Sequence, residues 1–277
     1  MSFSVLRKKE SLVMDTYKNK VRVAAHRGNS KYFPENTILG FKEALKLNVD
    51  QLEIDLHMTK DGEIIMMHDH KVDRTTNGTG LVRDFTLEEI RKLDAGSWKG
   101  EEFAGTQVPT FIEFLELLKD YPEMTVNVEL KDYPTEEDEE WAYISADKSI
   151  ALLEQYNMSD RIWINCWNGQ LLEYIDKKYD HKYRLHGYFP FDLLKGKMER
   201  HPYDYLHCAC LFGPKEQPVR DKADFDYTAN SGVEPWVYYP GDEEENYEQA
   251  IANGAMLITA NDPAKTLRFL QERGLHD

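Results

Sequence analysis

The sequence predicts an α/β protein, a (β/α)8 TIM barrel with a small inserted subdomain after the second strand. Apolar, β-branched runs alternate along the chain with longer segments of helical periodicity, which is typical of parallel sheets. Eight such units in roughly 250 residues fit a single barrel domain spanning residues 1–277. No glycine-rich G-x-G-x-x-G loop follows the first run, which disfavours the rival doubly wound sheet.

The eight expected strands are short apolar runs of similar length. In chain order they are VRVAAH (21–26), QLEIDLHM (51–58), TVNVELK (125–131), RIWINCW (161–167), YRLHGYF (183–189), YLHCACLF (205–212), VEPWVYY (233–239) and MLITAND (256–262).

The first expected helix, NTILGFKEALKLN, shows the pattern on which the other helix predictions rest. Ile38, Phe41 and Leu45 recur at i, i+3 and i+7, and Asn36 or Thr37 is a suitable N-cap. The sixth strand leads into a Pro- and Asp-rich connection without an expected helix. Further helices are expected at TFIEFLELLKDY (110–121), DKSIALLEQY (147–156), QLLEYIDKKY (170–179), FDLLKGKMER (191–200), NYEQAIANG (246–254) and PAKTLRFLQERG (263–274).

One interval interrupts this alternation. The insertion, at about 58–108, contains the β-like run EIIMMHD and the turn-like TTNGTG but little helical pattern. A stretch of this length inside a barrel is more often an inserted subdomain near the mouth of the active site than a plain loop.

Composition restricts the partners and the compartment. The formal net charge of −16 argues against nucleic acid or an anionic membrane as the main partner. Three cysteines leave an odd number, which favours a reducing compartment and buried thiols. The leader MSFSVLRKKESLVMD lacks the apolar stretch of a signal peptide, and no segment has the length of a transmembrane helix. We therefore expect a cytoplasmic protein without a stable membrane anchor.

Acidic residues lie at alternate positions of two expected strands. Glu53, Asp55 and His57 point to one face of the second strand, and Glu129 precedes Lys131 by two positions on the third. Inside a barrel, unpaired carboxylates are costly, and a divalent cation is the simplest remedy. The oxygen-rich set of Glu53, Asp55 and Glu129 suits one Mg²⁺ or Ca²⁺ ion. A salt-bridged structural role is the alternative.

Two histidines end apolar runs that could converge on one site. His26 ends the first strand, with Arg27 beside it, and His68 ends the β-like run of the insertion. Histidine exchanges protons near neutral pH, so the pair suits a reaction that needs both an acid and a base.

The ordered series AHRG, PENT, LEIDLHMTKDGEIIMMHDHKVDRTTNGTG and NVELK closely resembles the glycerophosphodiester phosphodiesterase family. The match spans roughly residues 22–131, with weaker echoes in INCWNGQLLEYI and LITANDP. The resemblance implies a (β/α)8 barrel that hydrolyses glycerophosphodiesters to sn-glycerol 3-phosphate and an alcohol.

The resemblance also assigns roles to matching residues. It implies that His26 and His68 are the acid/base pair, without indicating which is the acid, and that Arg27 and Lys131 bind the substrate phosphate. The implied metal ligands are Glu53, Asp55 and Glu129; Asp69 belongs to a His-Asp pair, and His57 lies behind the site.

The second half of the chain departs from the family pattern, which leaves the head group open. Aromatic residues gather at its expected strand ends, and Trp167, Trp236 and Tyr238 are candidates for a wall against the non-phosphate part of the substrate. Packing in the core or at the rim is the simpler interpretation of each. A lysophospholipase D and a non-catalytic glycerophosphodiester-binding protein are the alternative functions, and the oligomeric state is open.

Overall fold

The computed structural model describes residues 19–134 and 138–277. The leader MSFSVLRKKESLVMD and residues 135–137 of the acidic segment lie outside the described residues.

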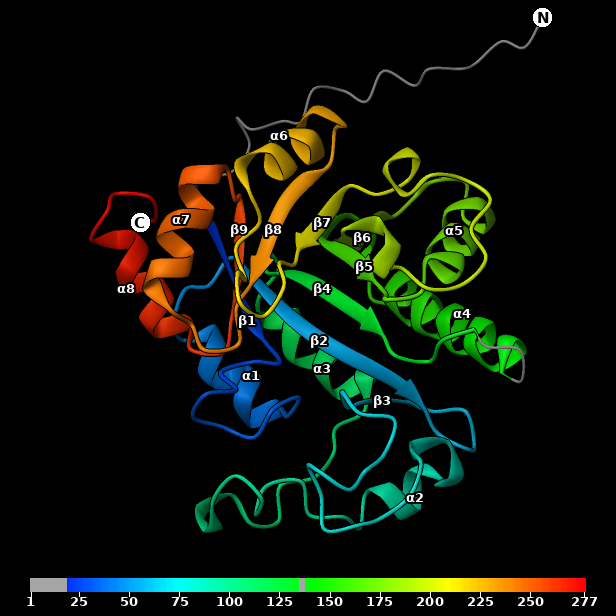
Figure 1. Ribbon diagram of the computed structural model, residues 1–277. Helices are drawn as coiled ribbons and strands as arrows, with labels where there is room; N and C mark the ends of the chain where they lie inside the picture. Colours follow the sequence, from blue (N-terminus) through cyan, green and yellow to red (C-terminus); the bar gives the residue numbers. More distant parts are fainter. Residues whose placement is uncertain (1–18, 135–137) are drawn as a thin grey trace, which may run out of the picture.

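A closed barrel of parallel strands forms the centre of the molecule (Figure 1). Consecutive barrel strands pair in chain order, and β1 pairs with both β2 and β9, so the sheet closes on itself. The predicted barrel is confirmed, and all eight expected strands take part in it. The barrel strands are β1 (Arg22–His26), β2 (Gln51–Met58), β4 (Thr125–Leu130), β5 (Ile162–Asn165), β6 (Arg184–Phe189), β7 (Cys208–Leu211), β8 (Glu234–Tyr238) and β9 (Leu257–Ala260).

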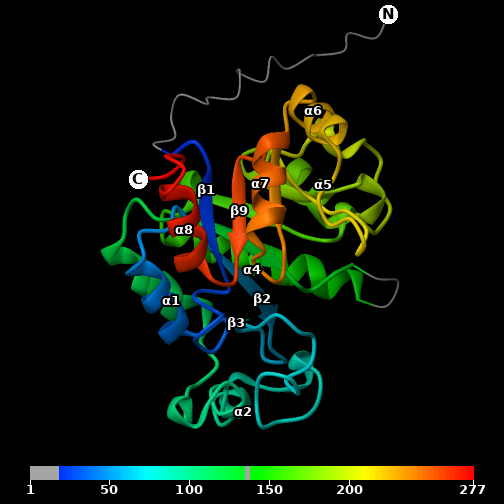
Figure 2. The same cartoon turned by 60° about the vertical axis from the view of Figure 1, so that its left-hand side comes forward.

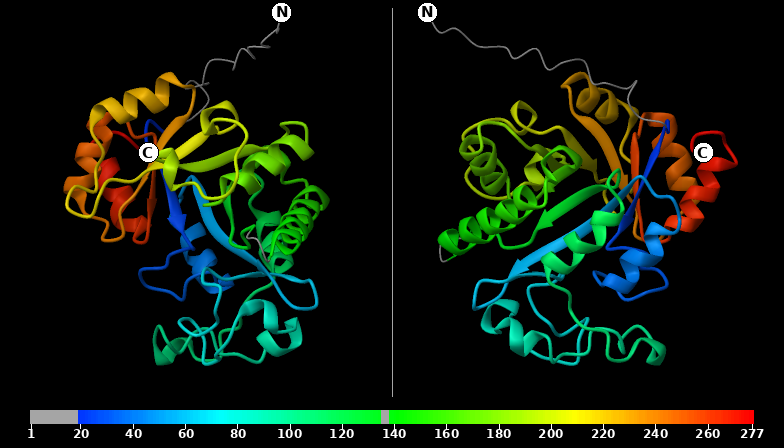
Figure 3. Two further views of the ribbon diagram at one scale, coloured as in Figure 1. Left: turned by 45° about the vertical axis from the view of Figure 1, so that its right-hand side comes forward. Right: turned by 180° about the vertical axis from the view of Figure 1, so that it is seen from behind.

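Helices surround the barrel on its outside, as the rotated views show (Figures 2 and 3). Thr37, and not Asn36, is the N-cap of the first helix, because its side chain accepts a hydrogen bond from the backbone N–H of Gly40. The helices around the barrel are α1 (Ile38–Leu45), α3 (Phe111–Leu117), α4 (Glu139–Gln155), α5 (Gly169–Lys178), α6 (Lys222–Asn230), α7 (Glu244–Asn253) and α8 (Pro263–Gln271).

The hydrophobic core has two parts that follow from the two faces of the strands. The larger part lies between the barrel and the helices, where side chains such as Phe41, Phe114 and Leu172 are fully buried. A smaller cluster inside the barrel includes Trp163 and Trp236. Because this cluster fills the interior, the barrel is a packed core with space for a site only at its end.

The residues after β2 leave the barrel before the next barrel strand begins. Strand β3 (Ile64–Met66) returns antiparallel to β2, and the short helix α2 (Leu87–Ile90) follows. The helix α2 and the loops around it lie below the barrel in Figure 1. They carry a separate small core of Ile65, Met67, Val72, Val82, Ile90, Ala95 and Val108. We infer from this second core that residues 58–108 are a subdomain.

Two helix predictions were wrong. The expected helix over 191–200 is only a 3₁₀ turn at Phe191–Leu193, because Gly196 has a φ of 91° and interrupts the helical backbone. Conversely, the Pro- and Asp-rich connection contains α6, which packs against β8. Only Phe225 and Thr228 of α6 are buried, so the sequence shows little of the apolar periodicity that predicts a helix.

Cys166, Cys208 and Cys210 are free and buried, as expected for strand cysteines. Among the described residues, no helix combines the length and the apolar character needed to cross a membrane.

Candidate active site

A cavity of about 200 Å³ lies at the carboxyl end of the barrel strands. Most of the residues singled out in the sequence line it together. Asp55 and Lys131 are buried behind this lining and contact it through ion pairs. The lining comprises His26, Arg27, Glu53, His68, Asn127, Glu129, Asn165, Trp167, His186, Tyr188, Cys210, Phe212, Tyr238 and Thr259.

A tight turn after β1 places His26 and Arg27 at the cavity. Arg27 has a φ of 56°, and its backbone N–H donates to the side-chain Oε2 of Glu53 at 3.0 Å. Gly28 follows with a φ of 83°, and a Cβ atom there would lie 2.7 Å from the carbonyl carbon of Gly40. Only glycine fits such a contact, so the packing of α1 against this turn fixes where the two charged side chains emerge.

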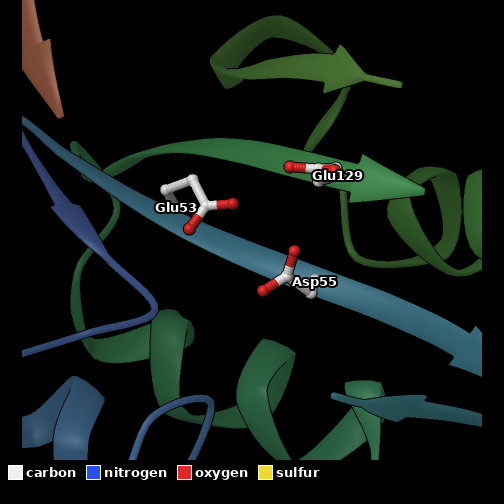
Figure 4. A group of neighbouring side chains, drawn as sticks. All are labelled: Glu53, Asp55 and Glu129. Carbon is white, nitrogen blue, oxygen red and sulfur yellow. The ribbon is translucent and has the colours of Figure 1, made fainter. Parts of the chain in front are cut away.

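Three carboxylates from two neighbouring strands form a compact group, the acidic triad (Figure 4). Glu53 and Asp55 extend from β2 and Glu129 from β4, and one oxygen of each lies within 4.8 Å of the others. Burial and the charges of Asp55 and Glu129 raise the pKa of Glu53 well above its usual value. Oδ1 of Asp55 is buried without a hydrogen-bond partner. These properties fit a divalent cation, which would relieve the repulsion and bind Oδ1 of Asp55.

Two cations are held against the acidic triad. Nε of Arg27 lies 3.2 Å from Oδ2 of Asp55, and Nζ of Lys131 lies 2.6 Å from Oε1 of Glu129 and 3.7 Å from Oδ1 of Asp55. Burial alone would raise the pKa of Asp55, but Arg27 and Lys131 outweigh it and lower the pKa to about 2. Arg27 and Lys131 therefore offset part of the negative charge of the acidic triad and place two cations beside the cavity.

His26 is held in one tautomer by a residue at the end of β9. Its Nδ1 lies 2.6 Å from Oδ1 of Asn261, whose amide nitrogen donates to the carbonyl of Pro240 at 2.9 Å. Because the amide nitrogen is engaged there, the amide oxygen accepts from Nδ1–H, and Nε2 is left as the proton acceptor. Burial and the charge of Arg27 lower the pKa of His26 to about 3, so the ring is neutral near pH 7.

His68 has a different environment. Its Nδ1 lies 2.6 Å from Oδ1 of Asp69, and both side chains are 31% exposed. A carboxylate in this position orients the ring and accepts its Nδ1–H. The two histidines therefore meet at one cavity with unlike partners, an amide for His26 and a carboxylate for His68.

Aromatic rings form one side of the cavity. Trp167 stacks on Tyr188 with ring centroids 3.5 Å apart, Phe212 packs against both, and Tyr238 lies 4.4 Å from the ring of His26. We call Trp167, Tyr188, Phe212 and Tyr238 the aromatic side.

Trp236 does not belong to this side, and its proposed contact with substrate is corrected. The residue is fully buried inside the barrel, where its ring packs against Trp163 and its Nε1–H donates to Glu234 at 3.0 Å. Position 236 is two residues before Tyr238 on β8 and points to the same face one layer deeper. Packing in the core, the simpler interpretation, describes Trp236.

Several residues around the site escaped the sequence analysis. Asn36 has a φ of 53° and donates from Nδ2 to Oδ2 of Asp55 at 2.8 Å, and Asn261 fixes His26. Glu35 forms ion pairs with Arg27 and Arg74. Arg74 also forms an ion pair with Asp69. Asparagine and charged residues are common in loops, so only the assembled fold distinguishes these residues from solvated ones.

Comparisons with known proteins agree with this geometry. The sequence model described as "Glycerophosphoryl diester phosphodiesterase family" matches residues 26–208. A curated "Glycerophosphodiester phosphodiesterase" from Caldanaerobacter subterraneus subsp. tengcongensis is 45% identical over 268 residues, covering 92% of this chain and 100% of that protein. Another from Bacillus subtilis is 41% identical over 149 residues, 50% of this chain and 48% of that protein.

Solved structures show the same fold. A phosphodiesterase from Oleispira antarctica, in complex with the product sn-glycerol-3-phosphate, superposes with a TM-score of 0.76 at 24% identity, covering 90% of this chain and 96% of that one. A glycerophosphodiester phosphodiesterase from Agrobacterium tumefaciens gives a TM-score of 0.71 at 24% identity, covering 88% and 97%. At this level of identity the superpositions support the barrel.

Proposed function

The chain belongs to the glycerophosphoryl diester phosphodiesterase family, and we propose that it hydrolyses glycerophosphodiesters to sn-glycerol 3-phosphate and an alcohol by two-histidine catalysis. The observation that carries this proposal is the convergence of His26, His68 and Arg27 on the cavity that borders the acidic triad. A scaffold or a salt-bridged core would not require two histidines to face the same cavity. The test is an assay for released sn-glycerol 3-phosphate.

The reaction sets three requirements that this chain's residues can meet. A phosphodiester is a stable anion, so its charge must be neutralised, the nucleophile must lose a proton, and the leaving alkoxide must gain one. Arg27 can clamp two phosphate oxygens with its planar guanidinium, and Lys131 adds a point charge. The bond from oxygen to phosphorus forms as the bond from phosphorus to the alcohol oxygen breaks.

The unlike partners of the two histidines suggest their roles. Neutral His26, with Nε2 unprotonated, would accept the proton of the nucleophile, which is water or the adjacent glycerol hydroxyl in a route through a cyclic phosphate. His68, whose ring is oriented by Asp69, would donate a proton to the leaving alcohol. This assignment follows from the different hydrogen-bond partners of the two rings.

One divalent cation, Mg²⁺ or Ca²⁺, completes the proposal. Glu53, Asp55 and Glu129 would hold it, since their oxygens are the ligand type that both ions prefer. When bound, the ion would supply positive charge to the phosphate oxygens.

The aromatic side is expected to contact the alcohol part of the substrate, and paired tryptophan variants test this. We expect Trp167→Ala to raise KM for glycerophosphocholine by about 5–30-fold, because a desolvated cation–π contact contributes about 1–2 kcal/mol, with much less change for glycerophosphoethanolamine. Trp236→Ala should instead lower the free energy of unfolding by about 3–5 kcal/mol, because it empties a fully buried site. Kinetics with both substrates and urea unfolding are the measurements.

Trp98→Ala, a change at an exposed tryptophan outside the cavity, is the control for the tryptophan pair. If Trp167→Ala left both KM values unchanged, Trp167 would be rim packing. If Trp236→Ala changed head-group preference at unchanged stability, its correction to core packing would be wrong.

Two alternatives differ from the proposal in measurable ways. A lysophospholipase D would act on lysolipids and leave water-soluble glycerophosphodiesters intact. A non-catalytic binding protein would bind glycerophosphodiesters without turnover, although the presence of both histidines favours an enzyme. The small-molecule substrate, the absence of nucleic-acid partners and the cytoplasmic location stay predictions.

A further inference from the structure

A single arginine of the insertion connects two parts of the site that come from different regions of the chain. Arg74 donates from Nε and Nη2 to the two oxygens of Asp69 at 2.7 and 3.0 Å. It also donates from Nη1 and Nη2 to the two oxygens of Glu35 at 2.9 and 2.8 Å. Asp69 belongs to the insertion, whereas Glu35 lies in the loop between β1 and α1.

Each of these carboxylates has a second partner in the site. Asp69 accepts from His68 at 2.6 Å, and Glu35 accepts from Nη1 of Arg27 at 2.9 Å. The result is one continuous series of hydrogen-bonded side chains, His68–Asp69–Arg74–Glu35–Arg27. Its two ends are the proton donor and the phosphate clamp proposed above, and Arg74 is its centre.

Arg74 supplies the positive charge that lies between the two carboxylates of this series, Asp69 and Glu35. Glu35 is largely buried, with 11% of its side chain exposed, and burial alone would raise its pKa. The hydrogen bond from Arg74 and the charge of Arg27 outweigh burial and lower the pKa of Glu35. Without Arg74, a buried Glu35 would rely on Arg27 alone and would compete with the substrate phosphate for its guanidinium.

We propose that Arg74 is a positioning residue: it fixes His68 through Asp69 and Arg27 through Glu35, and thereby holds the insertion in register with the barrel for catalysis. The planar guanidinium carries this role because it makes two parallel hydrogen bonds to each carboxylate, which a lysine cannot do. This inference rests on the proposed function, since it assigns His68 and Arg27 to one reaction.

The insertion offers a matched control for Arg74. Arg91 also crosses from the insertion to the barrel and donates to both oxygens of Glu113 on α3, at 2.8 and 2.9 Å. Its side chain is 29% exposed, against 44% for Arg74, and it does not line the cavity. Loss of Arg91 removes a similar bidentate pair between the same two parts of the molecule and leaves the site intact.

The experiment compares Arg74→Ala, Arg74→Lys and Arg91→Ala in the full chain with Mg²⁺ or Ca²⁺ added. We expect Arg74→Ala to lower kcat by about 10–100-fold, the range for a displaced catalytic group, and to weaken inhibition by sn-glycerol 3-phosphate several-fold. Arg74→Lys should regain little, and Arg91→Ala should stay within about twofold of wild type. Millimolar guanidinium should restore Arg74→Ala because the site is half exposed, whereas methylammonium should not.

Three results would overturn the inference. They are wild-type turnover in Arg74→Ala, an equal loss in Arg91→Ala, and a loss that guanidinium does not restore. If the wild type itself released no sn-glycerol 3-phosphate, the proposed function would fail separately. Calorimetric binding of sn-glycerol 3-phosphate, which needs no turnover, would then test whether Arg74 positions Arg27 through Glu35. Unchanged affinity in Arg74→Ala would overturn that part of the inference.

Discussion

Replacing either His26 or His68 by alanine is expected to lower kcat for glycerophosphocholine by about 10²–10⁴-fold, the usual contribution of one acid or base. His26 is held by Asn261 and His68 by Asp69, so each loss removes a proton carrier from a formed site. Steady-state kinetics with circular dichroism to check folding are the measurements. Turnover near wild type in either folded variant would show that the pair is assigned wrongly.

The leaving group distinguishes the acid from the base. A substrate that releases p-nitrophenol needs little protonation, so His68→Ala should lose much less activity on glycerophospho-p-nitrophenol than on glycerophosphocholine. His26→Ala should lose the same factor on both, because the nucleophile still has to be deprotonated. A reversed pattern would exchange the two roles.

The chain provides a matched control for His68. Nδ1 of His181 lies 2.7 Å from Oδ2 of Asp176, and the His181 side chain is 36% exposed, which resembles the His68–Asp69 pair. His181 does not line the cavity. We therefore expect His181→Ala to keep kcat within about twofold, which separates loss of an ion pair from loss of a proton carrier.

Neutralising the acidic triad is expected to have opposite effects on activity and on stability. Glu53→Gln should lower kcat/KM by about 10²–10³-fold, as losing one group that stabilises the transition-state charge does. Added Mg²⁺ or Ca²⁺ raises the midpoint of unfolding of the wild type by mass action, and this rise should disappear in the variant. Without metal, the variant should be at least as stable as the wild type, since one buried charge has been removed.

The pH dependence of stability also tests the burial of Glu53 in the acidic triad. Burial, Asp55 and Glu129 raise the pKa of folded Glu53 above the ordinary value of 4.5. A carboxyl group with a raised pKa in the folded state keeps its proton on folding, so its contribution to stability falls as the pH rises above about 4.5. Metal-free wild type should therefore lose stability from there towards neutral pH, and Glu53→Gln should lose less.

Glu173→Gln is the control for a buried carboxylate outside the site. Glu173 is 3% exposed and accepts from Nε of Arg200 at 3.0 Å. Removing its charge should lower stability and leave kcat unchanged, the reverse of Glu53→Gln. If Glu53→Gln behaved like Glu173→Gln, the triad would be a salt-bridged structural cluster.

The strands could be predicted from the sequence because a buried parallel strand leaves a continuous apolar run. The alternation of Glu53 and Asp55 also predicted that both would lie on one face of the strand; both are buried, and Figure 4 shows them close to Glu129. The prediction of a helix over 191–200 was wrong for a local reason, the positive φ of Gly196. Its apolar residues still pack: Leu194 is buried, although the segment is not helical.

The sequence also did not indicate how deep inside the barrel each side chain lies. Trp236 and Tyr238 share one face of β8, but only Tyr238 reaches the cavity. The spacing of two predicts the face and does not say which layer a side chain occupies. In the same way, the distance between Glu35 and Arg74 depends on how the insertion folds back on the β1–α1 loop, which no local pattern encodes.

The most direct test of the central claim is release of sn-glycerol 3-phosphate from a panel of glycerophosphodiesters and lysolipids. The assay is run on the wild type, after treatment with EDTA, and after Mg²⁺ or Ca²⁺ is restored. We expect activity on the water-soluble diesters that EDTA abolishes and one of the two ions restores. Activity that survives complete metal removal would contradict the role of the acidic triad, and activity on lysolipids alone would contradict the substrate.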